Sequence, residues 1–211
     1  MKEREVMRDN KYDVVISDLG NVLVNFDHRI AVRKILKHTP RPENEIYDLF
    51  FDSGLTELYE EGKLSTDEFF SGVKNSLELD MDKDEFFPIW NDIFFETPLN
   101  LKMRDFLKKI KSKYKIVMLS NLNITHFEFL KKNMAGLFSE FDKLVLSYEI
   151  GFRKPAPQIY KVPLDFAKTV ASRAFYVDDR RDLIEAAGKL GIKGVVFGGE
   201  EAFGRIVEEL R

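Results

Sequence analysis

The stretch VVISDLGNVLVNF, from Val14 to Phe26, decides the fold class. It opens with a continuous apolar run, which is typical of a strand buried on both faces in a parallel sheet covered by helices. Asp18 ends this run and is followed by a glycine turn and further apolar residues. An aspartate in this place either caps the turn or takes part in chemistry, and the stretch alone leaves both interpretations open.

Four later segments repeat this apolar character. They are KYKIVMLS ending at Ser120, KLVLS ending at Ser147, RAFYVDD ending at Asp179 and KGVVFGG near Gly199. Amphipathic stretches with helical spacing, such as LNLKMRDFLKKIKSK and RDLIEAAGKLG, lie between them. Strands that alternate with helices predict an α/β fold built on a parallel sheet.

The span from about Asp27 to Thr97 differs, because it carries several amphipathic helical patterns and no buried-strand run. Its segment EEGKLSTDEFF combines a helix stop and a helix start. Gly62 is expected to end one helix, and Ser65 or Thr66 to cap the next. The span therefore predicts an all-helical insertion after the first strand.

Composition limits the class of protein. The chain has 211 residues, 44% of them hydrophobic, which suffices for one domain or one domain with an insertion. No stretch approaches the roughly 20 apolar residues that span a bilayer, and the first residues are charged where a signal peptide is apolar. We therefore expect a cytoplasmic protein with no membrane partner. Its 33 basic and 36 acidic residues nearly balance, so no nucleic-acid partner is expected. For the oligomeric state, a monomer or a homodimer is expected.

The chain has no cysteine, which excludes disulfides, thiolate metal sites and a cysteine nucleophile. Any metal would be held by carboxylates, carbonyls, water or one of three histidines. Oxygen ligands favour magnesium-like ions.

Polar side chains follow four of the five predicted strands at their carboxyl ends, which is where open parallel sheets bind ligands. Each also has an ordinary structural interpretation: the serine as a helix N-cap, the lysine as a solvated loop residue, the aspartates as caps of the helix that starts near Arg180. Their equivalent positions at one sheet edge favour a shared site. The residues are Asp18, Ser120, Asn121, Lys154, Asp178, Asp179 and Asp182.

This set suits phosphoryl transfer. Several aspartates at one edge repel each other unless a cation neutralises them, and hard oxygen ligands select Mg²⁺. Asp18 would attack phosphorus and form an aspartyl-phosphate, while Lys154 and the Ser120 hydroxyl hold the phosphoryl oxygens. Water would complete the cycle, so the expected partner is a small phosphorylated metabolite.

Four motifs resemble those of the haloacid dehalogenase-like (HAD) hydrolases in order and spacing: DLGNV at Asp18, LSN at Ser120, KP at Lys154 and DDRRD from Asp178. The resemblance implies a Rossmann-like, three-layer core over residues 1–26 and 98–211. It also implies an inserted α-helical cap over residues 27–97, which gates the site and supplies specificity.

The resemblance assigns roles by position. Asp18 matches the nucleophile, and Ser120, Asn121 and Lys154 match the groups that bind the substrate phosphate. Magnesium ligands are implied at Asp18, Asp179 and the backbone carbonyl of Gly20. Asp178 and Asp182 match acidic positions around the metal, as direct, water-mediated or orienting groups.

One position departs from the family pattern, in which phosphatases usually carry a second aspartate, the general acid, two residues after the nucleophile. Here that position is Gly20, and a missing acid costs about 10² to 10⁴ in rate. Asp27 and His28 are nearby candidates for a relocated acid, with capping or surface roles as the alternative.

The substrate class also rests on resemblance. DLGNV, EEGKLSTDEFF and GFRKPAPQIY are similar to a branch of sugar-phosphate phosphatases, including ones that act on glucose 1-phosphate. Two alternatives stay open: a catalytically silent domain that binds a phosphorylated ligand or a protein partner, and a metal-independent 2-haloacid dehalogenase. The acidic cluster argues against the dehalogenase, which needs no metal beside its nucleophile.

Overall fold

Five parallel strands form the central sheet of the computed structural model, which describes residues 10–134 and 136–211. The strand order is β5-β4-β1-β6-β7, with β1 in the middle. This confirms the predicted α/β class, and each strand coincides with one of the five apolar runs. The charged start, residues 1–9, lies outside the described residues. The strands are β1 (Val14–Ser17), β4 (Lys115–Ser120), β5 (Lys143–Leu146), β6 (Ala174–Asp178) and β7 (Lys193–Val196).

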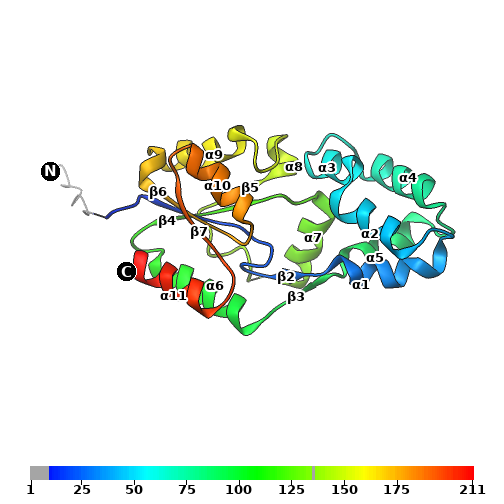
Figure 1. Cartoon of the computed structure of the whole chain (residues 1–211), viewed down its shortest axis with the longest axis horizontal. Helices are drawn as coiled ribbons and strands as arrows, with labels where there is room; N and C mark the ends of the chain where they lie inside the picture. The colour runs from blue at the N-terminus through cyan, green and yellow to red at the C-terminus, as the bar shows by residue number, and fades with distance from the viewer. Residues whose placement is uncertain (1–9, 135) are drawn as a thin grey trace.

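Helices cover both faces of this sheet and make three layers (Figure 1). On one face, α6 (Pro98–Ile110) and α11 (Glu200–Glu209) pack against Val15 and its neighbours. On the other face, α9 (Pro157–Ala167) and α10 (Arg181–Lys189) pack against Val14 and Ile16. Because alternate residues of a strand face opposite sides, β1 must be apolar at every position, and this explains its unbroken run.

A separate group of helices lies between β1 and β4 in the sequence and packs around its own aromatic core, which includes Trp90, Phe50 and Phe69. We call residues 28–91 the helical unit. Figure 1 shows it beyond one end of the sheet. Its elements are α1 (His28–Ile35), η1 (Leu36–His38), α2 (Glu43–Asp52), α3 (Gly54–Glu60), α4 (Thr66–Leu77) and α5 (Lys83–Asn91).

Two chain connections join the helical unit to the sheet, and they pair as short antiparallel strands, β2 (Asn25–Phe26) and β3 (Phe94–Phe95). The sequence did not indicate β3, because a two-residue, partly exposed strand carries no apolar run. The remaining elements are α7 (Ile124–Asn133), α8 (Ser147–Ile150) and η2 (Ala171–Arg173).

Helix boundaries follow local capping chemistry. Of the two caps that the sequence offered for α4, Ser65 and Thr66, the structure uses Ser65, in a capping box with Glu68. Asp27 caps α1 by accepting a hydrogen bond from the backbone N–H of Arg29 at 2.9 Å. Ser53 accepts a hydrogen bond from the backbone N–H of Thr56 and starts α3, so the amphipathic stretch from residue 45 to residue 62 forms two helices, α2 and α3. The Ser53 side chain thus divides a continuous amphipathic pattern.

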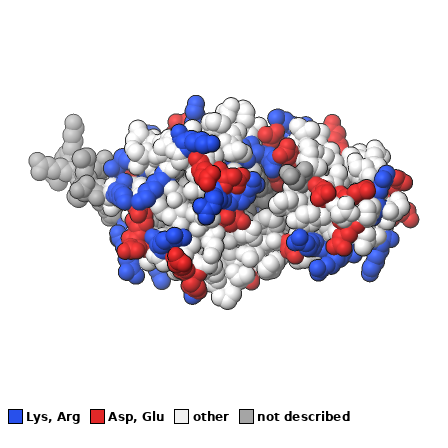
Figure 2. All heavy atoms as spheres, in the orientation of Figure 1, with Lys and Arg blue, Asp and Glu red and all other residues white. Residues whose placement is uncertain are grey.

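On the face seen in Figure 2, basic and acidic side chains are interspersed over both the sheet layers and the helical unit. Within the described part of the chain, no helix combines the length and the apolar character needed to cross a bilayer.

Candidate active site

The carboxyl end of β1 opens into a cavity of about 440 Å³. β4 lies on one side of β1 and β6 on the other, so the order in which strands are added to the sheet reverses at β1. Open α/β sheets bind ligands at such a switch point. The cavity is lined from both parts of the molecule. The sheet supplies Asp18, Ser120, Asn121, Lys154 and Asp179, and the helical unit supplies Phe51, Glu60 and Trp90 among others.

Lys154 lies at the centre of the polar groups. Its Nζ is 2.7 Å from Asp18 Oδ1 and 2.7 Å from Asp178 Oδ2, and the residue is only 4% exposed. Burial alone would lower the pKa of Lys154, but the two carboxylates outweigh it and hold that pKa above its usual range. The interpretation as a solvated loop lysine is therefore wrong, and the ammonium group joins β1 to β6.

Asp18 is a buried carboxylate at the end of β1, 7% exposed. Burial raises the pKa of Asp18 to about 7; Lys154 opposes this shift, and Asp178 and Asp179 add to it. Lys154 occupies Oδ1, and among the described residues no hydrogen bond reaches Oδ2. One oxygen of Asp18 is thus available to a ligand in the cavity.

Asp178 has both of its oxygens engaged within the protein. Oδ2 accepts hydrogen bonds from Lys154 and from the Tyr176 hydroxyl, and Oδ1 accepts from the backbone N–H of Arg180 at 2.9 Å. Tyr176 was not among the predicted site residues. It lies two residues before Asp178, and residues two apart in a strand share a face of the sheet, so its position could have indicated this contact.

Asp179 is held from the turn after β1. Asn21 donates from Nδ2 to Asp179 Oδ2 at 2.9 Å, and burial raises the pKa of Asp179. Asn21 has a φ of 55°, in the left-handed region that asparagine tolerates better than most residues. This contact was not predicted, although an asparagine after a glycine in a turn is a known signal for that backbone conformation.

One ligand oxygen from each of Asp18, Asp178 and Asp179 lies within 4.8 Å of the others. Three carboxylates around one ammonium group leave an excess of negative charge, and hard oxygen donors at this spacing fit a Mg²⁺ ion. Gly20 belongs to the same turn as Asn21. The structure places Asp182 elsewhere: its side chain is 59% exposed and pairs with Arg180 at 2.6 Å.

Ser120 and Asn121 follow β4 at the same edge. Ser120 is 3% exposed and lines the cavity, and it caps no described helix, because Asn123 caps α7. Asn121 exchanges two hydrogen bonds with the backbone of Lys154, at 3.1 Å and 2.8 Å. The Asn121 amide therefore fixes the loop that carries Lys154.

The haloacid dehalogenase-like hydrolase family matches residues 12–191, a range that contains both the sheet edge and the helical unit. The chain belongs to this family.

This HAD hydrolase is similar in sequence or structure to three other proteins. D-ribitol-5-phosphate phosphatase of Bacteroides thetaiotaomicron is 28% identical over 185 residues, which cover 85% of this chain and 88% of the relative. A HAD family enzyme from the same organism, crystallised with magnesium and inorganic phosphate, is 26% identical and matches with a TM-score of 0.77, covering 90% of this chain and 96% of that one. L-2-haloacid dehalogenase of Xanthobacter autotrophicus shares the fold at 18% identity, with a TM-score of 0.61 over 92% of this chain and 81% of its own.

Gly20, where HAD phosphatases usually carry a second aspartate, has no room for a side chain. A Cβ atom built there would lie 2.7 Å from Cε1 of Phe26. The Phe26 ring is itself packed against His28 and Phe94, with centroid distances of 5.4 Å and 6.3 Å. In this HAD hydrolase an aromatic ring thus fills the space beside Gly20.

Asp27 and His28, the two candidates for a relocated general acid, lie in different environments. The carboxylate of Asp27 caps α1 and accepts from Arg29 N. His28 lines the cavity, but burial lowers its pKa to about 4, so the imidazole is neutral near pH 7. The Asp27 carboxylate is thus engaged at the start of α1, and the His28 imidazole is not in the protonated form that would act as an acid at that pH.

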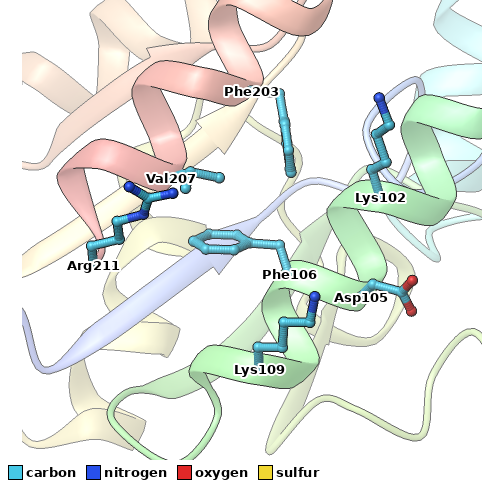
Figure 3. A pocket seen from close by; sticks show the side chains of 7 residues that line it. All are labelled: Lys102, Asp105, Phe106, Lys109, Phe203, Val207 and Arg211. Atoms are coloured by element: carbon cyan, nitrogen blue, oxygen red, sulfur yellow. The ribbon is translucent and has the colours of Figure 1, made fainter.

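A second cavity, of about 430 Å³, lies between α6 and α11 (Figure 3). Its floor is formed by Phe106, Phe203 and Val207, and Lys102, Lys109 and Arg211 lie around it. It shares no lining residue with the cavity at β1. The group formed by Lys154 and the three carboxylates therefore lies apart from this second cavity.

Proposed function

We propose that this HAD hydrolase cleaves phosphate monoesters of small metabolites, of the sugar-phosphate or alditol-phosphate class, with magnesium and through an aspartyl-phosphate on Asp18. The observation that carries the proposal is Lys154, bound to Asp18 and Asp178, with Asp179 beside them at the mouth of one cavity. The D-ribitol-5-phosphate phosphatase relative supports the substrate class, and the enzyme crystallised with magnesium and phosphate supports the cofactor.

Asp18 performs the first step. Lys154 holds Oδ1, so the free Oδ2 attacks phosphorus, the phosphorus–ester oxygen bond breaks, and the leaving alkoxide takes a proton from water. Lys154 and the Ser120 hydroxyl stabilise the negative charge on the phosphoryl oxygens. Water then attacks the aspartyl-phosphate, releases inorganic phosphate and restores the Asp18 carboxylate.

The metal would be held by the Asp18 carboxylate, the Asp179 carboxylate and the Gly20 carbonyl. When bound, magnesium supplies positive charge that offsets the carboxylates and the substrate phosphate. Asp178, with both oxygens engaged, orients Lys154 and is assigned no direct bond to the ion. Asp182, paired with Arg180 in solvent, is assigned no role at the metal.

Residues 27–97, which contain the helical unit, are assigned the role of a cap over a core formed by residues 1–26 and 98–211. Its support is the cavity, whose walls come from both parts, and the pair of connections β2 and β3. Movement about these two connections would admit substrate and then exclude water. The cytoplasmic location and the monomeric or dimeric state stay predictions.

Two other activities are less well supported. The dehalogenase shares the fold alone, and the group formed by Asp18, Asp178 and Asp179 supplies a cation site that a metal-independent reaction does not use. A silent binding domain gives no reason for a carboxylate with one free oxygen beside a buried lysine.

Turnover of a panel of phosphate esters tests the proposal. The panel contains D-ribitol 5-phosphate, glucose 1-phosphate and p-nitrophenyl phosphate, each assayed with Mg²⁺ and with a chelator. The wild-type protein is expected to release phosphate only with Mg²⁺, and Asp18→Asn to release none. Equal turnover by the Asp18→Asn variant would overturn the assignment of the nucleophile.

A further inference from the structure

The cavity wall opposite the carboxylate cluster combines aromatic and charged groups. Phe51 and Trp90 come from α2 and α5, and Glu60 is the last residue of α3. Arg153, next to Lys154 in the chain, lines the same cavity. The space into which a leaving group must extend from Asp18 is therefore neither uniformly apolar nor uniformly charged.

Arg153 pairs with two glutamates of α3, and only one of them lines the cavity. Its Nε lies 2.7 Å from Glu60 Oε2, and its Nη1 lies 2.6 Å from Glu57 Oε1. The Glu60 side chain is 19% exposed, whereas the Glu57 side chain is 52% exposed and is not part of the cavity lining. The same guanidinium group therefore holds one carboxylate in the wall and one on the outer surface.

The Glu60 carboxylate keeps unused acceptor capacity. Arg153 pairs with Oε2, and within the described part of the chain no hydrogen bond reaches Oε1. A carboxylate in a half-buried wall is costly to desolvate, so it normally keeps a hydrogen-bond donor on each oxygen. Its free oxygen points to a donor supplied from the cavity.

Three further polar atoms of the cavity-lining residues are buried and have no hydrogen-bond partner in the described structure: His28 Nδ1, Trp90 Nε1 and Arg153 Nε, whose approach to Glu60 is an ion pair. Such atoms are uncommon in folded proteins and call for a partner that the protein does not supply. Glu60 needs a donor and the Trp90 indole needs an acceptor. A hydroxyl group is both, and a polyhydroxylated chain presents several of them beside C–H faces that suit aromatic rings.

We propose that Glu60 is the specificity-determining residue of this enzyme, and that its carboxylate, held by Arg153, accepts hydrogen bonds from the hydroxyl groups of a polyhydroxylated leaving group. The inference rests on the proposed phosphatase function and adds the residue that selects the substrate. Because Glu60 is an acceptor and carries negative charge, it also disfavours leaving groups that are anionic or lack hydroxyl groups.

The test compares two substrates in three full-length proteins. kcat and KM are measured with Mg²⁺ for D-ribitol 5-phosphate, which has hydroxyl groups along its leaving group, and for p-nitrophenyl phosphate, which has none. The proteins are the wild type, Glu60→Gln and the control Glu57→Gln, which removes the other carboxylate partner of Arg153. The quantity compared is the ratio of the two kcat/KM values, because it cancels any loss common to both substrates.

The proposal predicts that Glu60→Gln lowers this ratio by about tenfold or more, the scale of one lost hydrogen bond to a charged group. The loss is expected mainly in KM for the alditol phosphate, and Glu57→Gln is expected to keep the wild-type ratio. An unchanged ratio in Glu60→Gln overturns the proposal, and so does an equal fall in Glu57→Gln, which would indicate that the position of Arg153 matters instead.

The same assay distinguishes a failure of the role proposed for Glu60 from a failure of the proposed phosphatase function. A wild-type protein that hydrolyses p-nitrophenyl phosphate with Mg²⁺ but no polyhydroxylated ester contradicts the role of Glu60 and leaves the phosphatase function standing. A wild-type protein that hydrolyses no ester contradicts both. Thermal unfolding of each variant identifies a protein that has failed to fold, in which case Glu60→Asp, which keeps the charge but shortens the reach, replaces Glu60→Gln in the same comparison.

Discussion

Among the single residues of the site, Lys154 supplies the positive charge that offsets the buried carboxylates. Its ammonium group is buried between Asp18 and Asp178, and the nearby Asp179 adds a third carboxylate. Replacing it by the apolar Met would leave buried carboxylates without their cation. Breaking a buried ion pair in this way typically costs about 3–5 kcal/mol.

We therefore predict that Lys154→Met lowers the free energy of unfolding by about 3–5 kcal/mol at neutral pH in the absence of metal, and that Mg²⁺ restores part of the loss. Urea unfolding with and without Mg²⁺ measures both effects. Lys161→Met, on the exposed side of α9, is the control and is expected to change stability little. A Lys154→Met protein as stable as the wild type would contradict the described burial.

Gly20 lies close to the Phe26 ring. A Cβ atom at position 20 would lie 2.7 Å from the Phe26 ring, so Gly20→Ala is expected to cost about 1–3 kcal/mol through overpacking. In a Phe26→Leu background, which opens this space, the same substitution should cost less. A double-mutant cycle by urea unfolding measures the coupling between the two positions. Additive effects would show that the ring is not what fills the space.

Several site residues could be predicted from the sequence because each ends an apolar run at the same sheet edge, as Asp18, Ser120 and Asp178 do. The hydrogen bonds that hold them could not. Asn21 binds Asp179 and Asn121 binds Lys154 between segments far apart in the chain, and a single sequence records no such pairing. Tyr176 differs, because it lies two residues before Asp178 and on the same face of the strand.

At the scale of elements, a close contact joins the helical unit to the sheet layers. A Cβ atom at Gly62 would lie 2.1 Å from the Tyr148 carbonyl oxygen, and Gly62 has a φ of 66°. Gly62→Ala is therefore expected to destabilise the protein by at least about 1–3 kcal/mol, because both the left-handed backbone and the approach to α8 are lost.

Thermal or urea unfolding of Gly62→Ala checks this prediction. Gly54→Ala is the matched control, since a Cβ atom at Gly54 would meet nothing within 4 Å. If both substitutions have the same small effect, the approach of α3 to α8 is looser than described.

His126 links α7 to α5 of the helical unit. Its ring stacks on Trp90 at 4.9 Å, its Nε2 bonds the Trp90 carbonyl at 3.2 Å, and its Nδ1 accepts from the Asn123 amide at 3.0 Å. A proton on Nδ1 would face that amide donor. Burial is the main reason that the pKa of His126 is lowered to about 3.

The sign of the resulting pH effect follows from linkage. Between pH 6.5 and pH 3 the unfolded chain binds a proton at His126 that the folded chain does not, so this residue removes stability as the pH falls. The expected loss between neutral pH and pH 5 is about 2 kcal/mol. His126→Gln should show a pH dependence that is flatter by this amount in urea unfolding at the two pH values. Parallel profiles would contradict the neutral, buried ring.

Most elements could be predicted because their signals are local. Apolar runs mark the strands, and Ser65 with Glu68 marks the start of α4. The sequence did not predict the division at Ser53 or the strand β3, since a capping side chain within an amphipathic pattern and a two-residue strand leave the hydrophobic period unchanged.

At the scale of the whole molecule, the cavity lies where two separately packed parts meet. The sheet layers bring the nucleophile, the lysine and the carboxylates, while the helical unit brings the aromatic wall and Glu60. The family motifs predicted the first set. The second set could not be predicted, because which face of the helical unit meets the sheet edge depends on the packing of α3 against α8, a contact between distant parts of the chain.

If Asp18 is the nucleophile, it carries a phosphoryl group during turnover, and this covalent intermediate can be detected. Wild-type protein is mixed with D-ribitol 5-phosphate and Mg²⁺, quenched in acid during turnover and digested, and the peptide that contains Asp18 is weighed by mass spectrometry. We expect a mass increase of one phosphoryl group on that peptide, absent without Mg²⁺ and absent in Asp18→Asn. Phosphate released by the wild type with no labelled Asp18 peptide, or a label in the Asp18→Asn protein, would contradict it.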